Sequence, residues 1–177
     1  MVLLILCVSL SWARDERMGV VVLPAQTQGA SATQGAELVR ALEAELPDVE
    51  GFRLVHLSGQ ARLLLDEDPR CREQPDCLLP LLPSGAELVI DPRLVRVDGQ
   101  VAADLRLLRK GELSKRVAAP VPSGGLEDLV QAEMPLLLRG WARDERLYLL
   151  AVQGNEDAAR QLQERFPESP YTRALSR

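Results

Sequence analysis

The stretch Met-Gly-Val-Val-Val-Leu-Pro, residues 18–24, decides the fold. It is a continuous apolar run, which predicts a strand buried on both faces, because a strand with one face in water alternates apolar and polar residues. A loop rich in Gly, Ser, Thr and Gln follows over residues 26–34. Residues 36–46 then carry leucines at every fourth position and predict an amphipathic helix that ends before a proline.

Shorter elements follow this strand and helix. Residues 52–57 alternate in period two and predict a second strand, and residues 59–65 predict a short helix that Ser58 can cap. Further along, residues 126–134 predict a covering helix, which Pro135 must kink or divide.

Between these helices the sequence predicts an antiparallel meander. The dipeptides Asp98-Gly99 and Lys110-Gly111 are typical of tight turns and separate segments of alternating apolar residues. We expect the three strands over residues 87–97, where Pro92 can break the strand, 100–108 and 112–118.

The resulting order, β-α-β-α-β-β-β-α, is that of an α/β fold, and we predict a two-layer α/β sandwich with one mixed sheet. The end of the chain has a different pattern. Residues 142–153 and 156–166 predict two short helices, joined by a Gly-Asn dipeptide and followed by a final short turn or helix. The sequence therefore predicts an α/β domain over residues 18–139 and an αα-hairpin over residues 142–177.

The first ten residues, Met-Val-Leu-Leu-Ile-Leu-Cys-Val-Ser-Leu, are apolar and uncharged. Small residues follow at Ser11 and Ala13, which is typical of a signal peptide over residues 1–13. The run is too short to span a bilayer, and it lacks the basic residues that usually precede such a run. We predict an exported protein whose mature chain does not cross the membrane. The alternative is a cytoplasmic domain whose apolar start is a buried strand or helix.

The cysteines fit this prediction of export. Cys7 leaves with the signal peptide, and Cys71 and Cys77 remain as a pair separated by five residues. A close pair in an exported protein predicts a disulfide, worth roughly 2 kcal/mol for so short a loop. The alternative is a redox pair, which the spacing disfavours because it is not Cys-x-x-Cys. Two cysteines and the distant His56 do not supply a zinc site.

Composition and charge exclude several classes of function. The chain has 177 residues, of which 46% are hydrophobic, and a formal net charge of −5. This hydrophobic fraction is that of a globular protein. The negative net charge disfavours a general nucleic-acid binder and electrostatic docking on an anionic membrane. We therefore expect no nucleic acid as a partner.

The sequence shows no catalytic constellation. His56 is the only histidine, and no Gly-x-Ser-x-Gly segment exists to pair it with a nucleophile. The loop over residues 29–35 lacks the Gly-Lys-Ser/Thr of a phosphate-binding loop. We interpret it as a connector between strand and helix, in which Ser31 or Thr33 caps the helix. We predict a non-enzymatic protein without cofactor or metal. The rival interpretation is a small exported enzyme that uses Cys71 and Cys77 as a redox pair or His56 as a base.

Two resemblances extend this interpretation. Residues 20–24, 29–46 and 84–90 resemble the first strand, the Gly/Ser loop with its helix, and the later Gly-Ala-Glu strand of the TolB amino-terminal domain and related envelope modules. This likeness covers residues 18–139, and no β-propeller follows it. Residues 142–175, with Leu-Ala-x-x-Gly and Phe-Pro-x-Ser-Pro-Tyr segments, resemble one degenerate tetratricopeptide unit. A single unit must pack on the first domain or on a partner, because such arrays need about three units to be stable.

These resemblances imply a role in the cell envelope. We expect a periplasmic or outer-membrane-associated protein of a Gram-negative bacterium. Its expected function is to bind an envelope protein in envelope assembly or maintenance, through the sheet edge or the groove of the helical hairpin.

Overall fold

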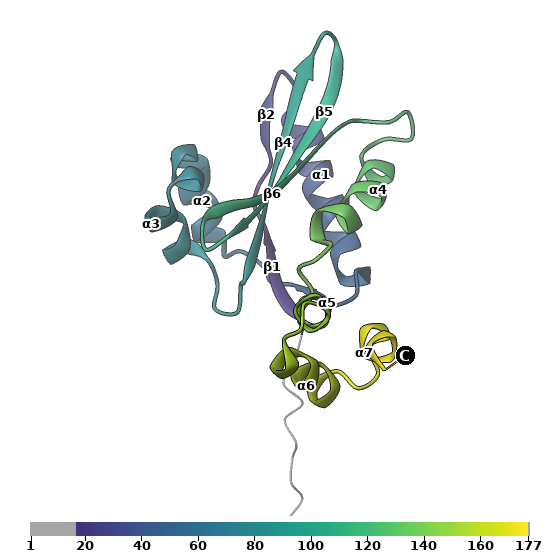
Figure 1. Ribbon diagram of the computed structural model, residues 1–177. Helices are drawn as coiled ribbons and strands as arrows, with labels where there is room; N and C mark the ends of the chain where they lie inside the picture. The colour runs from purple at the N-terminus through teal and green to yellow at the C-terminus, as the bar shows by residue number, and fades with distance from the viewer. Residues whose placement is uncertain (1–16, 177) are drawn as a thin grey trace, which may run out of the picture.

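The computed structural model describes residues 17–176, so the predicted signal peptide and Cys7 lie outside the described residues. One six-stranded sheet forms the centre of the molecule (Figure 1). Its strands are β1 (Met18–Val22), β2 (Gln26–Gln28), β3 (Phe52–Leu54), β4 (Leu88–Val97), β5 (Gln100–Arg109) and β6 (Glu112–Pro120). The α-helices are α1 (Ala32–Glu45), α2 (Gly59–Glu67), α3 (Pro75–Leu78), α4 (Leu126–Leu138), α5 (Arg143–Val152), α6 (Glu156–Arg165) and α7 (Pro170–Leu175). Three short 3-10 helices, η1 (Leu46–Asp48), η2 (Pro69–Glu73) and η3 (Leu79–Leu81), complete the described elements.

The sheet is mixed, with the strand order β3-β1-β4-β5-β6 and β2 beside β4. β1 pairs in parallel with β3 and β4, whereas β4, β5 and β6 are antiparallel. This topology confirms the predicted α/β fold with one mixed sheet. The predicted two layers become three, because helices pack on both faces of the sheet. β2 is an additional short strand inside the segment predicted as a loop, and its backbone pairs in parallel with residues 93–95 of β4.

β1 is buried over its whole length because helices cover both faces of the sheet. Figure 1 shows α1 and α4 on one side of the sheet and α2 and α3 on the other. Val20 and Val22 belong to a core shared with α1 and α4, while Val21 and Leu23 belong to a second core shared with α2 and η2. The unbroken apolar run is the sequence form of a strand with two buried faces.

Pro92 does not break β4, which runs continuously from Leu88 to Val97. On one side β4 pairs with β1 up to Ile90 and with β2 from Arg93 onward. Pro92 therefore lies at the change from one neighbouring strand to the other, where a missing N–H interrupts neither ladder. The two predicted turns of the meander are confirmed, since Asp98, Gly99 and the corresponding residues of the second turn all have positive φ.

β3 ends at Leu54, earlier than the strand predicted over residues 52–57. Val55 still donates its N–H to the carbonyl of Val20, but the chain then turns towards α2, where Leu57 is buried in the second core. His56 consequently lies in an exposed loop and not on a strand. The predicted strand over residues 52–57 would have contained His56, and this part of the prediction is wrong.

α4 passes through Pro135 as one helix and ends at Leu138. The proline removes one backbone hydrogen bond, but Met134, Leu137 and Leu138 are all buried in the first core. Packing of this apolar face holds the helix together across the proline, because tertiary contacts supply most of a helix's stability.

The helices α5, α6 and α7 follow at one end of the molecule (Figure 1). Trp141 precedes them, and its ring centroid lies 5.6 Å from the guanidinium carbons of both Arg109 in β5 and Arg146 in α5. Arg143 Nη2 lies 2.6 Å from Oε1 of Glu87, next to β4. Cation–π contacts and an ion pair thus join the helical end to the sheet.

Candidate functional site

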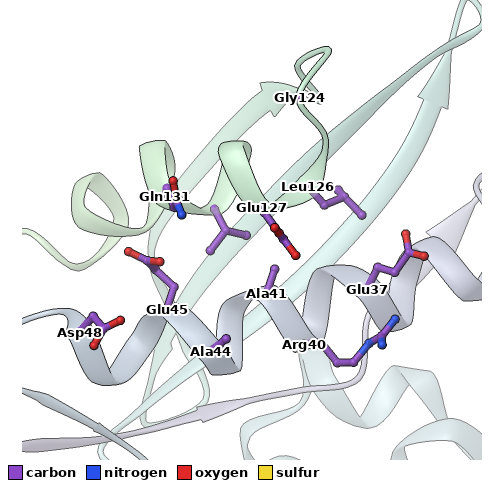
Figure 2. Close-up of a pocket in the computed structure, with 11 residues that line it drawn as sticks. Glu37, Arg40, Ala41, Ala44, Glu45, Asp48, Gly124, Leu126, Glu127 and Gln131 are labelled. Carbon is purple, nitrogen blue, oxygen red and sulfur yellow. The ribbon is translucent and has the colours of Figure 1, made fainter.

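A groove with a volume of about 690 Å³ lies between α1 and α4, which cover the same face of the sheet. Figure 2 shows the two helices running side by side in the same direction, with Ala41, Glu45 and Glu127 between them. The lining residues are Glu37, Arg40, Ala41, Ala44, Glu45, Asp48, Gly124, Leu126, Glu127, Val130 and Gln131.

The groove exists because alanines stand where α1 faces α4. The inner stripe of α1, which includes Leu38 and Leu42, is fully buried in the first core. Ala41 and Ala44 lie beside this buried stripe on the surface of α1. Their side chains are short, so the space between the two helices is left unfilled. On the opposite wall, Val130 is buried and Leu126 is partly buried. The floor of the groove is therefore apolar.

Four carboxylates and one guanidinium surround this floor. The carboxylates belong to Glu37, Glu45, Asp48 and Glu127, and the guanidinium belongs to Arg40. Among residues 17–176, no ion pair joins any of these five side chains to another group. The groove therefore presents an excess of three negative charges that no cation of the described chain neutralises.

Two of these carboxylates occupy an electrostatically unfavourable end of α1. Glu45 is the last residue of the helix and Asp48 ends η1 directly after it, and the last turn of α1 contains no basic residue. The C-terminal end of a helix carries a partial negative charge, so an anion there costs roughly 0.3–1 kcal/mol. Glu127, in contrast, lies in the first turn of α4, where a negative charge is favourable.

A capping box defines the N-terminal end of α1. The hydroxyl of Ser31 accepts a hydrogen bond from the N–H of Gln34, and the side chain of Gln34 accepts one from the N–H of Ser31. This capping box starts the helix at Ala32, four residues before the predicted start. Ser31 is one of the two caps predicted for this helix, so that prediction is confirmed.

The groove is lined by charged and apolar groups and by few groups that could act in catalysis. Its lining consists of carboxylates, one guanidinium, one amide and apolar groups, without a hydroxyl, a thiol or an imidazole. In residues 17–176, no group of three His, Cys, Asp or Glu side chains is placed to hold a metal ion. Over the same residues, no helix is long and apolar enough to cross a membrane.

The predicted site residues lie away from the groove. Cys71 in η2 and Cys77 in α3 are brought together as a disulfide, with their sulfur atoms 2.07 Å apart. Cys71 is 2% exposed and belongs to the second core. His56 is exposed in the loop after β3, and it lines neither the groove nor the disulfide segment. The structure thus joins the two cysteines and leaves the histidine apart.

Next to the disulfide lies a buried charge cluster that the sequence analysis missed. Asp91 of β4 is 1% exposed, and its Oδ1 lies 3.2 Å from Nη1 of Arg72, which follows Cys71 in the chain. Oδ2 of Asp91 lies 3.2 Å from Nη2 of Arg93 and 3.5 Å from Nη1 of Arg106. Arg72 also donates to the carbonyl of Pro24, two residues after the end of β1. One carboxylate thus ties the disulfide segment to two strands.

The sequence did contain a signal for this cluster. Residues at alternate positions of a strand share a face, so Asp91 lies on the same face as the buried Val89. A carboxylate at a buried strand position needs partners, because an unpaired buried charge is costly. Arg93 on the same strand supplies one of them, and its hydrogen bond to Glu73 lowers the pKa of that carboxyl below 4.5.

Comparison with known proteins gives partial similarities of structure. No family model matches the chain, and no curated protein matches it. Lipoprotein GNA1162 from Neisseria meningitidis is 15% identical with a TM-score of 0.48, and the match covers 70% of this chain and 99% of that one. The hypothetical protein CT253 from Chlamydia trachomatis is 16% identical with a TM-score of 0.41, covering 78% and 96%. The C-terminal domain of LpoB from Escherichia coli is 19% identical with a TM-score of 0.41, covering 60% and 83%. With TM-scores below 0.5, none of these similarities assigns a function to the chain.

Proposed function

We propose that this protein is a non-enzymatic, exported cell-envelope protein that binds another envelope protein in envelope assembly or maintenance. The observation that carries the proposal is the groove between α1 and α4, an open hollow with an apolar floor and a charged rim. Protein interfaces have this arrangement, with an apolar centre that loses its water and a polar border that stays hydrated. A groove between two helices is also a common docking site for a partner's segment.

Export is the second part of the proposal. Residues 1–13 have the pattern of a signal peptide, and the disulfide between Cys71 and Cys77 fits an oxidising compartment. We place the protein in the periplasm or at the outer membrane of a Gram-negative bacterium. The TolB-like interpretation of residues 18–139 and the tetratricopeptide-like interpretation of residues 142–177 remain predictions within this proposal.

The helical end offers a further surface for a partner. Leu149, Leu150 and Val152 of α5 are 43%, 44% and 56% exposed. Three apolar side chains near the end of one helix are a small patch, so we treat this surface as an accessory to the groove. No contact in the described residues favours the rival enzyme: Cys71 is buried, and His56 stands apart from both cysteines.

Site-specific photo-cross-linking tests the proposed function. A benzophenone amino acid is placed at Ala44 or Gln131 in the groove, and at Gln163 on α6 as an exposed control, in the full-length protein expressed in its native host. We expect one discrete adduct with an envelope protein from both groove positions and none from the control. The adduct partner, identified by mass spectrometry and purified, should then bind the purified chain. Absence of an adduct at both groove positions contradicts the proposed function.

A further inference from the structure

We infer that the occupant of the α1–α4 groove is a basic segment of the partner protein, in which Lys or Arg side chains are separated by small apolar ones. This inference rests on the proposed function and names the chemistry of the partner. It follows from the charge of the rim, the position of the carboxylates on α1, and the shape of the floor.

The charge of the rim favours a cation. Four carboxylates and one guanidinium line the groove, and none of them has an ionic partner within residues 17–176. The outer side of the same helix is different, because Glu43 of α1 is paired with Arg62 of α2 at 3.1 Å. The chain thus neutralises the acidic residue that faces α2 and leaves the acidic groove open to a partner's charges.

The distribution of charge along the groove gives the occupant a direction. Figure 2 places Glu45, Asp48 and Gln131 towards one end, and Glu37, Arg40 and Leu126 towards the other. Glu45 and Asp48 add their charge to the negative end of the α1 dipole, without a basic residue in the last turn. The basic residues of the occupant therefore lie over the C-terminal end of α1. At the other end of the groove, Arg40 would bind a carbonyl or carboxylate of the occupant.

The floor favours a protein segment over a small cation. Ala41, Ala44, Leu126 and Val130 present apolar surface that a hydrated metal ion or a polyamine would leave wet. Short apolar side chains between the basic residues would cover this surface and exclude its water. A volume of about 690 Å³ accepts a few side chains of a segment, and not a whole domain.

The inference is tested by peptide binding to the purified full-length chain. The probes are three fluorescein-labelled twelve-residue peptides in which alanine alternates with Lys, Gln or Glu, and the readout is fluorescence anisotropy. The groove variant is E45Q/D48N/E127Q. The matched control is E67Q/E164Q/E168Q, which removes the same charge from three exposed positions outside the groove. Thermal unfolding of both variants checks that they are folded.

We expect the Lys peptide to bind the wild type and the control with similar Kd values, and the groove variant at least about fivefold more weakly, since each exposed ion pair contributes about 0.2–1 kcal/mol. Binding should weaken as salt rises from about 20 to 200 mM, and the Glu peptide should not bind. Equal loss of binding in both variants overturns the inference, because net charge alone would then attract the peptide.

A second readout separates this inference from the proposed function. The cross-linking experiment at Ala44 is repeated in the E45Q/D48N/E127Q and E67Q/E164Q/E168Q backgrounds. Loss of the adduct only in the groove background supports a basic occupant. An adduct of equal yield in all backgrounds means that a protein occupies the groove but its basic residues do not hold it there. In that case the inference fails and the proposed function stands.

Discussion

Arg72 and Asp91 form a buried ion pair that joins the disulfide segment to the centre of the sheet. Nη1 of Arg72 lies 3.2 Å from Oδ1 of Asp91, and the two side chains are 3% and 1% exposed. Arg72 follows Cys71 directly, so the covalent staple and the ion pair act on the same short helix, η2. The disulfide closes a loop between η2 and α3, and the ion pair attaches this loop to the sheet.

Removal of one partner of this pair should be strongly destabilising. Asp91→Ala leaves Arg72, Arg93 and Arg106 without their shared carboxylate, and we expect a loss of about 3–5 kcal/mol in the free energy of unfolding. Urea denaturation of the purified protein measures this. The double variant Arg72→Met with Asp91→Leu should lose less than Asp91→Ala, because no buried charge is left alone. A loss below about 1 kcal/mol for Asp91→Ala would contradict this account and would mean that water or Glu73 satisfies the arginines.

Loss of the disulfide should lower the stability and loosen the ion pair beside it. Replacement of Cys71 and Cys77 by serine should cost about 2 kcal/mol in the free energy of unfolding, because it frees a short loop in the unfolded chain. A double-mutant cycle with Arg72→Met should give a coupling energy above about 0.5 kcal/mol. Additive effects would mean that η2 keeps Arg72 in place without the staple.

The carboxyl of Glu73 should make a stability contribution that depends on pH. Hydrogen bonding from Arg93, together with the charges of Arg93 and Arg106, lowers its pKa in the folded protein below the ordinary 4.5. A lowered pKa stabilises the fold above the unfolded-state value, and this stabilisation disappears as the pH falls through the folded-state pKa. The difference in free energy of unfolding between wild type and Glu73→Gln should therefore be present at pH 7 and shrink below about pH 4.5. A difference that stays constant from pH 7 to pH 3 would contradict this reading of the contact.

Lys115 should stabilise the C-terminal end of α4. Its ammonium donates to the carbonyls of Leu136 and Arg139 from the neighbouring strand β6. Both the hydrogen bonds and the positive charge suit the last turn of a helix, so Lys115→Met should cost about 1 kcal/mol. Lys110→Met at the β5–β6 turn is the matched control and should have little effect. Similar unfolding midpoints for the two variants would remove the capping role.

Neutralisation of the groove should raise stability while it weakens binding. Glu45 and Asp48 lie at the negative end of α1, so the variant E45Q/D48N should gain roughly 0.5–1 kcal/mol in the free energy of unfolding. The same variant should bind the Lys peptide more weakly than the wild type. Such an opposition is expected of residues retained for function at the expense of stability. A variant that is less stable than the wild type would indicate that the two carboxylates support the fold.

Most strands of the sheet could be predicted because their sequence patterns are distinctive. The unbroken apolar run in β1 indicated two buried faces, and the turn dipeptides at Asp98 and Lys110 fixed the meander. The prediction was wrong for the end of β3, where His56 leaves the strand because the chain turns to bury Leu57. The course of β4 past Pro92 was not predictable, because it depends on where β1 gives way to β2.

The groove and the distant partners of Asp91 could not be predicted from local patterns. Glu45 and Glu127 are about eighty residues apart in the sequence and come together only because α1 and α4 share one face of the sheet. Arg72 and Asp91 likewise belong to different elements. Local periodicity tells which side chains leave the core, but pairing between distant elements decides which of them meet.

The most direct test of the central claim is the cross-linking yield at Ala44 in the native envelope, compared with that at Gln163 on α6. If the groove binds a basic segment of an envelope protein, position 44 gives one adduct with one such protein. That adduct is lost in E45Q/D48N/E127Q and kept in E67Q/E164Q/E168Q. If positions 44 and 131 both give no adduct, or only the adducts seen at position 163, the groove is not the binding surface and the proposed function is contradicted.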